Sequence, residues 1–426
     1  MPFIAETGGQ NAMVVDSSAL AEQVVADVIA SAFDSAGQRC SALRILCLQE
    51  EIADRILLML KGAMRELAVG DPRHLSTDVG PVITPEAAEG IGRHLAAMRA
   101  RGFAVDQLAL PLETEGGTFV PPTLIEIGRV ADVEREVFGP VLHVLRYRRA
   151  DLDDLLAAIG ATGYGLTFGL HSRIDQTIAR VLDRVRAGNR YVNRNIIGAV
   201  VGVQPFGGSG LSGTGPKAGG PLYLGRLIRR APEGAYDGLA AASFPVPAYR
   251  AWLIAKGYGP VAERLATVCY PAQREIELAG PVGERNLYAL RPRGRVAAIA
   301  ETGPGLLIQI GMILACGNHA VVVLGERYGA LLRDLPSDVA ARVAHAPDLD
   351  AAGDIQAVLF EGGADGALVI NAAVAARDGA ILSIQARTPG ALADGDLYGV
   401  AGLVGEVSTA INTAAAGGNA SLMRVG

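Results

Sequence analysis

Residues 33–42 read FDSAGQRCSA, and they join a helix-like apolar run to the apolar segment 43–48. The small residues at 35–37 predict a tight turn between the two. Cys40 follows that turn beside Arg39, whose charge would favour the thiolate, as would a nearby helix N-terminus. A cysteine in this position is a candidate nucleophile, whereas many lone cysteines are buried structural residues.

A carboxylate lies in a second informative stretch, AETGGQN at residues 5–11. Glu6 stands on a Gly-rich turn, where a carboxylate can activate a water molecule. Such a water would cleave a thioester formed on Cys40. The two residues together favour covalent catalysis over a structural cysteine, although Glu6 could also be a loop carboxylate in a salt bridge.

The segments around Cys40 alternate between strand and helix patterns, with Ser17 or Ser18 expected to cap the first helix. This alternation predicts an α/β fold with a parallel sheet. The predicted elements here are strands at 12–16 and 43–48 and helices at 19–33 and 50–68.

The composition changes near residue 230, where basic residues give way to APEG at 231–234. Beyond it, strand and helix patterns alternate again, with glycine at the strand-to-helix turns. This layout predicts a second, Rossmann-like sheet. Its predicted elements are strands at 295–300, 320–324 and 356–360 and helices at 306–316 and 367–376.

Bulk properties exclude several classes of protein. The chain has 426 residues, half of them hydrophobic, which is enough for two domains. The net charge of −6 argues against nucleic acid or an anionic membrane as the main partner. No apolar run reaches the ~20 residues that span a bilayer, and the N-terminus has no signal-peptide pattern. The four cysteines form no CxxC pair, which indicates a reducing cytoplasm.

Three motifs, in order and spacing, resemble the aldehyde dehydrogenase superfamily. They are ETGGQNA from Glu6, Cys40 at 34 residues beyond that glutamate, and EVFGPV at residues 136–141. QRCSA and the glycine-rich run 205–224 look like the glutamate-semialdehyde (1-pyrroline-5-carboxylate) dehydrogenase branch. The ending INTAAAGGNASLMRVG at 411–426 resembles the tail of long bifunctional proline-utilisation proteins of bacteria.

The resemblance implies a domain order. Residues 1–230 would be an aldehyde dehydrogenase catalytic domain, 231–244 a linker, and 245–426 a degenerate aldehyde-dehydrogenase-like Rossmann domain with a structural role. The basic residue that the family would place at about 324–326 to hold the adenosine ribose is absent. In the family an NAD-binding domain precedes the motif of Glu6. That N-terminal domain is therefore expected to be missing here, and the chain to be the C-terminal part of a longer protein.

The resemblance also assigns roles to the motif residues. Cys40 would be the nucleophile and Glu6 the base that hydrolyses the thioester. Glu136 and Phe138 would hold the nicotinamide ribose and ring of NAD, although the same segment alone reads as a plain turn into a strand. The Cys40 backbone N–H can be one donor to the oxyanion.

The glycine-rich loop 207–220 would bind the substrate's α-carboxylate through backbone N–H groups, unless it is an ordinary surface loop. By resemblance the substrate-binding residues are Ser41, Gly219 and Gly220, while Phe206 lines the pocket wall or belongs to the core. FAD is expected only on the missing N-terminal part. No histidine has the spacing of a metal ligand, so no metal is expected.

Two hypotheses follow. The chain is the catalytic part of an NAD-dependent glutamate-semialdehyde dehydrogenase acting on a small molecule. Alternatively it is a non-catalytic assembly module, or a lid over a channel between two active sites. The family resemblance implies a homo-oligomer or association with the missing N-terminal part.

Overall fold

The computed structural model describes residues 3–227, 243–271, 275–323 and 325–414. The chain packs into two compact units. The larger unit comprises Glu6–Gly213, Glu277–Leu287 and Ser408–Gly426, and the smaller unit comprises Met1–Ala5, Thr214–Ile276 and Tyr288–Val407. Except for its last two residues, the linker predicted at 231–244 lies outside the described residues. That boundary stays a prediction.

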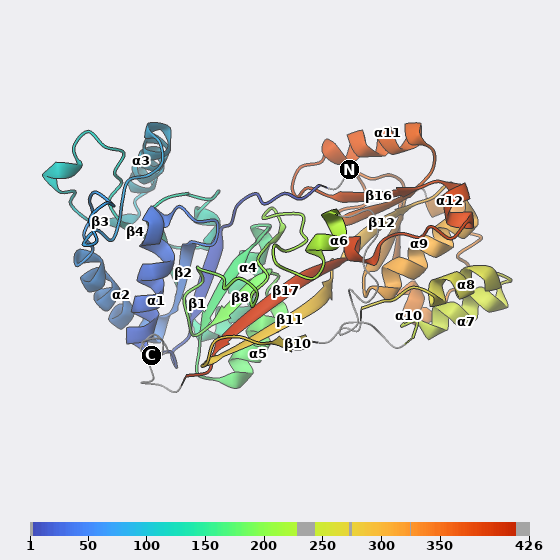
Figure 1. Ribbon diagram of the computed structural model, residues 1–426, viewed down its shortest axis with the longest axis horizontal. Helices are drawn as coiled ribbons and strands as arrows, with labels where there is room; N and C mark the ends of the chain where they lie inside the picture. The colour runs from blue at the N-terminus through green and yellow to red at the C-terminus, as the bar shows by residue number, and fades with distance from the viewer. Residues whose placement is uncertain (1–2, 228–242, 272–274, 324, 415–426) are drawn as a thin grey trace. The chain divides into compact units, whose positions relative to one another are not determined.

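The main sheet has ten strands among the described residues, in the order β10-β11-β17-β8-β7-β1-β2-β5-β4-β3 (Figure 1). From β17 to β4 all neighbours are parallel, and β3 is antiparallel to β4. The strands are β1 (Asn11–Val15), β2 (Leu43–Gln49), β3 (Ala104–Gln107), β4 (Thr123–Ile127), β5 (Val141–Tyr147), β7 (Thr167–His171), β8 (Asn189–Val192), β10 (Glu275–Leu278), β11 (Glu284–Pro292) and β17 (Val404–Asn412).

Central strands of this sheet are apolar because helices cover both faces of a parallel sheet. Every residue of β1 and β2 is buried. Helix α1 packs against α2, and all five helices of the larger unit contribute to one apolar core. These helices are α1 (Ala21–Phe33), α2 (Glu50–Arg65), α3 (Pro85–Ala100), α4 (Leu152–Ala161) and α5 (Asp175–Arg184).

The predicted cap of the first helix is wrong. Helix α1 begins at Ala21 after Leu20, which makes no side-chain capping bond. The serines are engaged elsewhere: the Ser18 hydroxyl donates to Asp16 and accepts from the Arg173 N–H. These bonds tie the ends of β1 and β7 together, so tertiary contacts override the local capping pattern.

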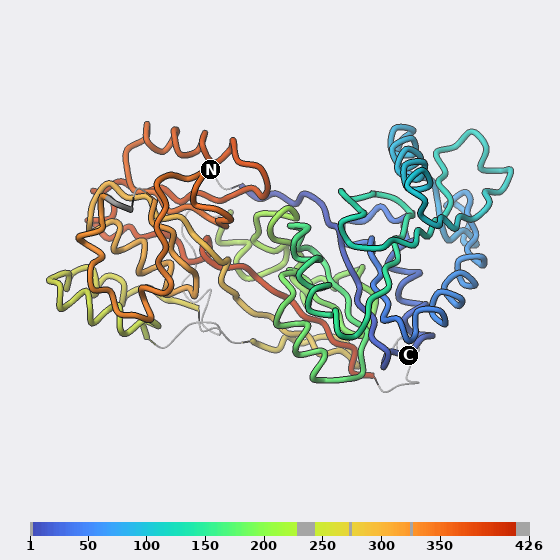
Figure 2. Tube along the Cα trace, turned by 180° about the vertical axis from the view of Figure 1, so that it is seen from behind, coloured from blue at the N-terminus to red at the C-terminus, as the bar shows by residue number. Residues whose placement is uncertain are grey.

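The last described strand was not expected from the sequence. β17 lies between β11 and β8, as the red, yellow and green segments show from both sides (Figures 1 and 2). Its residues 408–411 pair in parallel with 189–192 of β8. Residues more than 200 positions after β8 therefore form an inner strand of the same sheet.

The smaller unit contains a five-stranded parallel sheet in the order β14-β13-β12-β15-β16. Helix α11 lies on one face and α9 contacts the other (Figure 1). The elements are β12 (Arg295–Ile299), α9 (Gly303–Ala315), β13 (His319–Val323), α10 (Ser337–Ala340), β14 (Val343–Ala346), β15 (Ala357–Glu361), α11 (Ala364–Ala375), β16 (Ser383–Arg387) and α12 (Pro389–Ala393), with α6 (Tyr223–Leu227), α7 (Pro247–Ala255) and α8 (Gly259–Ala266) preceding them.

The predicted α/β class, with a parallel-rich sheet and a second Rossmann-like sheet, is confirmed. Within the described ranges, no helix combines the length and the apolar character that crossing a bilayer requires.

Candidate active site

The turn before Cys40 has an unusual backbone. Helix α1 ends at Phe33, and Ser35, Ala36 and Gly37 follow with φ of 55°, 53° and 63°. A left-handed conformation costs a non-glycine residue about 1–2 kcal/mol, so the surrounding structure must hold this turn in place. Only glycine fits at position 37, because a Cβ there would lie 2.2 Å from the Gly139 carbonyl oxygen.

Cys40 is half-buried, between this turn and β2. Asn11, at the start of β1, fixes its backbone: Asn11 Nδ2 donates to the carbonyls of Cys40 (2.7 Å) and Ala42 (2.9 Å). The Asn11 Oδ1 accepts from the Thr167 N–H of β7 (3.0 Å). Asn11 therefore ties the turn of Cys40 to both β1 and β7.

The charges around the thiol differ from the sequence prediction. Burial raises the pKa of Cys40, and the carboxylates of Glu6 and Glu136 raise it further, while the backbone N–H groups of Ser41 and Cys40 oppose them. Arg39 does not stabilise the thiolate, because its exposed guanidinium donates instead to the Ser35 hydroxyl (3.0 Å). The expectation that Arg39 lowers this pKa is wrong.

Glu6 lies in an exposed segment that crosses to the glycine-rich loop. It forms an antiparallel bridge with Gly213, and the Thr7 N–H donates to the Ser212 carbonyl (3.3 Å). Its carboxylate is close enough to contribute to the pKa of Cys40. The structure thus brings the two predicted catalytic residues together in the larger unit.

Two glycines allow the loop of Glu6 to approach the nucleophile turn. A Cβ on Gly9 would lie 2.7 Å from the Cys40 carbonyl oxygen. A Cβ on Gly8, whose φ is 129°, would lie 2.6 Å from Glu136 Oε2. The two glycines are therefore required where the loop of Glu6, the turn of Cys40 and the segment of Glu136 meet.

Glu136 is held from two sides. Its Oε2 accepts from the Gly9 N–H (3.0 Å), and its Oε1 accepts from the buried guanidinium of Arg44 (3.3 Å). Phe138 is 44% exposed, with the Arg44 guanidinium 5.1 Å from its ring centroid. Both predicted cofactor residues therefore lie next to the turn of Cys40.

The predicted substrate residues are divided between the two units. Ser41 is buried beside the nucleophile, and its carbonyl accepts from the Thr167 hydroxyl (3.2 Å). Phe206 is half-buried in the same larger unit. Gly219 and Gly220 belong to the smaller unit, where Gly219 has a φ of 70° and is exposed.

Buried Glu406 supports the loop at Gly220. Its Oε2 accepts from the Lys217 N–H (2.6 Å) and its Oε1 accepts from the Tyr288 hydroxyl (2.6 Å). A Cβ on Gly220 would lie 2.5 Å from Glu406 Oε1, so only glycine fits. Burial raises the pKa of Glu406.

Two residues that hold the site, Asn11 and Arg44, have no role in the sequence prediction. A signal for Arg44 was present, because a charged residue interrupts the otherwise apolar run LRILCL at 43–48. Such a residue in a strand covered on both faces must be buried and needs several partners.

The smaller unit has its own glycine-rich turn, at the N-terminus of α9, where Rossmann-like folds bind phosphate. A carboxylate already fills this turn. Glu361 accepts from the N–H groups of Glu301 (3.1 Å) and Thr302 (2.9 Å) and from the Thr302 hydroxyl (2.7 Å). A Cβ on Gly305 would lie 2.0 Å from Glu361 Oε2, so this glycine accommodates the protein's own carboxylate.

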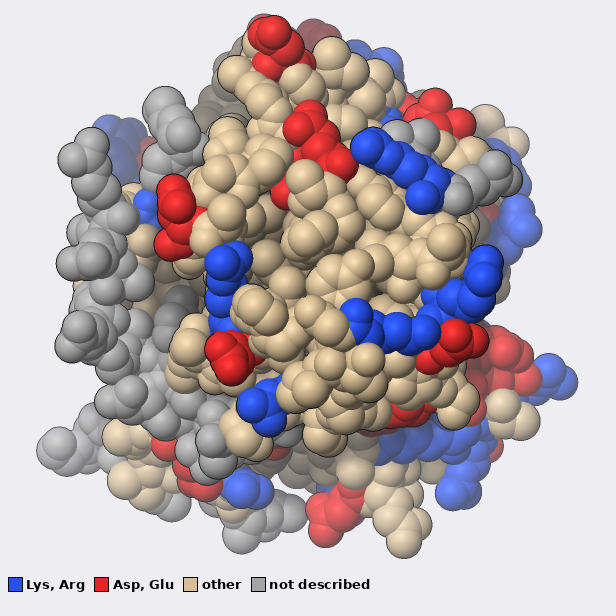
Figure 3. All heavy atoms as spheres, turned by 90° about the vertical axis from the view of Figure 1, so that its right-hand side faces the viewer, with Lys and Arg blue, Asp and Glu red and all other residues tan. Residues whose placement is uncertain are grey.

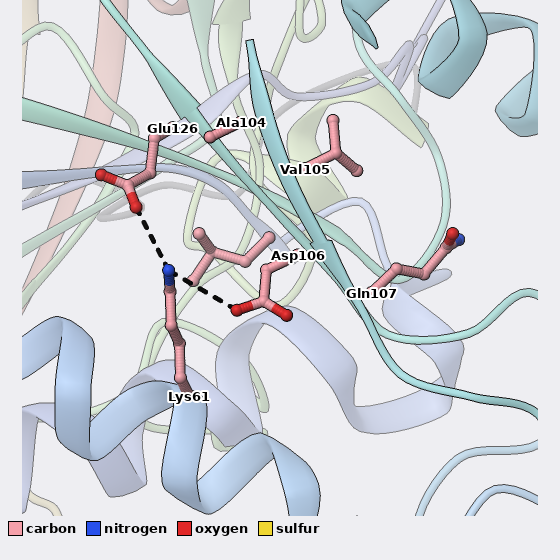
Figure 4. Close-up of a pocket in the computed structure, with 7 residues that line it drawn as sticks. Lys61, Ala104, Val105, Asp106, Gln107 and Glu126 are labelled. Atoms are coloured by element: carbon pink, nitrogen blue, oxygen red, sulfur yellow. Dashed lines mark hydrogen bonds and ion pairs between the residues drawn. The ribbon is translucent and has the colours of Figure 1, made fainter.

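One hollow in the described surface lies elsewhere. It measures about 340 Å³ and lies on α2, β3 and β4, where Lys61 pairs with Asp106 (3.5 Å) and Glu126 (3.2 Å) (Figure 4). Its charged groups satisfy one another, and it holds none of the predicted site residues. No group of three potential metal ligands occurs among the residues that the structure covers.

The face shown in Figure 3 carries acidic and basic side chains scattered among uncharged ones. This mixed surface accompanies the modest net charge of −6. It differs from the single-sign basic patch that marks a protein surface for nucleic acid.

Comparison with known proteins gives a family match and close relatives. The profile of the "Aldehyde dehydrogenase family" matches residues 1–229. Over its full length the chain is 53% identical to the "Bifunctional protein PutA" of Rhizobium meliloti, and 48% identical to that of Escherichia coli. It spans 35% and 34% of those proteins. The chain therefore corresponds to about a third of the length of these relatives.

Shorter relatives and solved structures match as well. Over 52% of the chain and 42% of the relative, the identity to the "1-pyrroline-5-carboxylate dehydrogenase" of Bacillus cytotoxicus is 36%. A solved proline utilization A from Corynebacterium freiburgense is 25% identical and covers 97% of the chain, with a TM-score of 0.72, while the chain covers 39% of it. A crystal structure of bifunctional proline utilization A is 57% identical over 53% of the chain, with a TM-score of 0.51, and is covered to 23%.

Proposed function

The chain belongs to the aldehyde dehydrogenase family, and on that premise we propose that it carries the site that oxidises L-glutamate γ-semialdehyde to L-glutamate with NAD. The semialdehyde would arise from 1-pyrroline-5-carboxylate, which the names of its relatives suggest. One observation carries the proposal: Cys40 is accessible, and its turn is packed against the loops of Glu6 and Glu136. The activity is proposed for the whole protein in which this chain occurs.

Cys40 begins the proposed reaction. Its sulfur attacks the aldehyde carbon, forming a carbon–sulfur bond and an oxyanion in a thiohemiacetal. The Cys40 backbone N–H is available as a donor to that oxyanion. Because burial and two carboxylates raise the pKa of the thiol, the thiol must give up its proton to solvent water as the sulfur attacks.

The residues at Glu136 and Phe138 fit a nicotinamide cofactor. An ionised carboxylate has about four acceptor positions. Arg44 and the Gly9 N–H use two of those on Glu136, which leaves room for the two ribose hydroxyls. The exposed ring of Phe138 can pack against a flat heterocycle. NAD, when bound, supplies the hydride acceptor that brings the substrate carbon to the oxidation level of a thioester.

Glu6 completes the proposed cycle. Its carboxylate takes a proton from water, and the resulting hydroxide attacks the thioester carbon. The carbon–sulfur bond breaks, glutamate leaves, and Cys40 is restored. The exposure of the Glu6 segment supports this role, because solvent water can reach it.

In the larger unit, Ser41 would bind the substrate's α-carboxylate, with Phe206 lining the pocket. In the smaller unit, taken by itself, Gly219 and Gly220 would offer backbone N–H groups to an anion. The small residues at both places support this assignment, because they leave N–H groups accessible to an anion. The bonds from Lys217 and Tyr288 to Glu406 support it further, since they fix the backbone beside Gly220.

We propose a non-catalytic, structural role for residues 245–426, as an assembly module or lid. The occupied turn at Glu361 supports this, since the position of a dinucleotide phosphate is taken by a side chain. Glu361→Gln should lower the free energy of unfolding by about 1–3 kcal/mol through its weakened hydrogen bonds. It should leave the NAD affinity of the protein unchanged, and a loss of NAD affinity would argue against the structural role.

The decisive test of the activity compares two cysteine variants in the full-length protein. Cys40→Ser should abolish NADH formation from the semialdehyde, because a serine hydroxyl is a far weaker nucleophile. Cys269→Ser, at an exposed cysteine, is the matched control and should keep the parental kcat. Semialdehyde oxidation that survives Cys40→Ser would refute the proposal and favour a non-catalytic assembly module.

A further inference from the structure

Arg44 is a fully buried charge near the start of the apolar strand β2. Its side chain has no exposed surface, and burial lowers its pKa, a shift that Glu136 opposes. Removing a guanidinium from water costs several kcal/mol unless good partners replace the water. The hydrogen-bond partners of Arg44 must therefore offset the free energy that its burial costs.

The partners of Arg44 come from two separate segments. Nη1 donates to the carbonyls of Gly37 (2.7 Å) and Gly139 (3.1 Å). Nη2 donates to the carbonyl of Arg39 (3.1 Å) and to Glu136 Oε1 (3.3 Å). Each terminal nitrogen thus bridges the turn that presents Cys40 and the segment of the cofactor carboxylate.

Both segments need such a support. The nucleophile turn contains Ser35 and Ala36 in left-handed conformations, which are strained and would relax without external bonds. The segment of Glu136 holds the exposed ring of Phe138, and the guanidinium also contacts that ring. Arg44 therefore fixes both segments to one rigid strand.

The backbone of Arg44 is itself anchored. His143 Nδ1 lies 3.0 Å from the Arg44 carbonyl oxygen, and His143 Nε2 lies 2.9 Å from His94 Nε2. Because a carbonyl only accepts, His143 carries its proton on Nδ1, and its Nε2 accepts from His94. Burial lowers the pKa of His143 to about 3, so the ring of His143 stays neutral near pH 7.

We propose that Arg44 is a positioning residue that sets the distance between the Cys40 nucleophile and the nicotinamide ribose clamp at Glu136. This inference rests on the proposed function. On this inference, Arg44 aligns the Cys40 sulfur with the nicotinamide that Glu136 would hold. These two groups would act on opposite sides of the reacting carbon. Because an error of about 1 Å in such an alignment can cost 10²-fold in rate, the residue contributes to turnover without touching the substrate.

The test uses Arg44→Lys in the full-length protein, because lysine keeps the charge but cannot bridge four oxygen acceptors in one plane. The expected result is a fall in kcat of about a hundredfold. NADH, as the probe in a fluorescence titration, should bind about tenfold more weakly, which corresponds to about 1.4 kcal/mol. The KM for the semialdehyde should change by less than a factor of three, because the substrate contacts are untouched.

Arg190→Met is the matched control. Arg190 is another buried arginine, and it donates to the carbonyls of Leu182, Val185 and Ala187. Its replacement should lower the melting temperature while kcat and NADH affinity stay within a factor of two. Parental kcat and NADH affinity in Arg44→Lys would overturn the proposal, as would an equal loss of both in Arg190→Met.

Failure of the proposed function can be distinguished from failure of the inference about Arg44. If Cys40→Ser keeps the activity, the proposed function fails, yet the NADH titration still tests the link from Arg44 to Glu136. If Arg44→Lys does not fold, hydrogen exchange in the parental protein tests whether the Cys40 turn and the segment of Glu136 are coupled. Saturating NADH should then slow amide exchange at residues 35–42 together with 136–139. Slowing at 136–139 alone would overturn the proposal.

Discussion

At Cys40 the neighbouring charges that act on the thiol are mainly negative. Burial raises its pKa first, and Glu6 and Glu136 add to that shift. A carboxylate beside a thiol disfavours the thiolate, so neutralising Glu6 must lower the pKa of Cys40. We therefore predict that Glu6→Gln shifts the midpoint of Cys40 alkylation by iodoacetamide to lower pH, measured by mass spectrometry of the peptide across a pH series.

Glu22→Gln is the control for this measurement, because Glu22 is an exposed residue that pairs with Arg55. It should leave the alkylation midpoint of Cys40 unchanged. A midpoint in Glu6→Gln that stays in place, or moves to higher pH, would show that the Glu6 carboxylate is not near the sulfur.

The turn between α1 and β2 is the element on which the site depends. A Cβ on Gly37 would meet the Gly139 carbonyl at 2.2 Å, and its φ of 63° disfavours any side chain. We predict that Gly37→Ala lowers the free energy of unfolding by more than ~2 kcal/mol and abolishes semialdehyde oxidation. Urea unfolding followed by circular dichroism, together with an NADH assay, measures both effects.

The same substitution in a helix provides the comparison. Gly62 lies in α2, and a Cβ there would have no neighbour within 4 Å. Gly62→Ala should stabilise the chain by up to about 1 kcal/mol, since alanine favours the helix. If Gly37→Ala is as well tolerated as Gly62→Ala, the turn is not the rigid support described above.

Elements with a strong local pattern were predictable from the sequence. The apolar run at 43–48 is β2, and the 3.6-residue periodicity of 50–68 is α2, which ends at Arg65. The cap at Ser17 or Ser18 was not, because the Ser18 hydroxyl donates to nearby Asp16 and accepts from the N–H of Arg173, which is 155 residues away in the sequence. Local propensity decides an element only where no long-range partner competes.

The same limit applies to the site. The motifs of Cys40 and Glu6 predicted residues that the structure brings together in one unit. The sequence could not predict whether Arg39 acts on the Cys40 thiol, because the bond from the Arg39 guanidinium to the Ser35 hydroxyl fixes where that side chain points. The role of Arg44 depends in part on the carbonyl of Gly139, which is 95 residues away in the sequence.

At the scale of the whole molecule, the end of the chain stabilises its beginning. Ala410 of β17 is 2% exposed, pairs with Tyr191 of β8, and belongs to the core of the larger unit. We predict that Ala410→Asp destabilises that unit by several kcal/mol, because a buried unpaired charge is costly. Proteolysis should then cleave the region of Cys40 faster.

Thr413→Asp is the matched control, because Thr413 is exposed just beyond the same strand. It should leave the protease resistance of residues 33–49 unchanged. Equal resistance in Ala410→Asp would mean that β17 is dispensable for the sheet that carries the site.

The most direct test of the central claim, that Cys40 and Glu6 divide the chemistry between them, is the mass of the Cys40 peptide after one turnover. Full-length Glu6→Gln would be mixed with semialdehyde and NAD, quenched in acid and digested. We predict a glutamyl thioester on Cys40, because the thioester forms but is not hydrolysed, and no adduct in Glu6→Gln combined with Cys40→Ser. Parental turnover without an adduct in Glu6→Gln, or an adduct on another residue, would contradict the account.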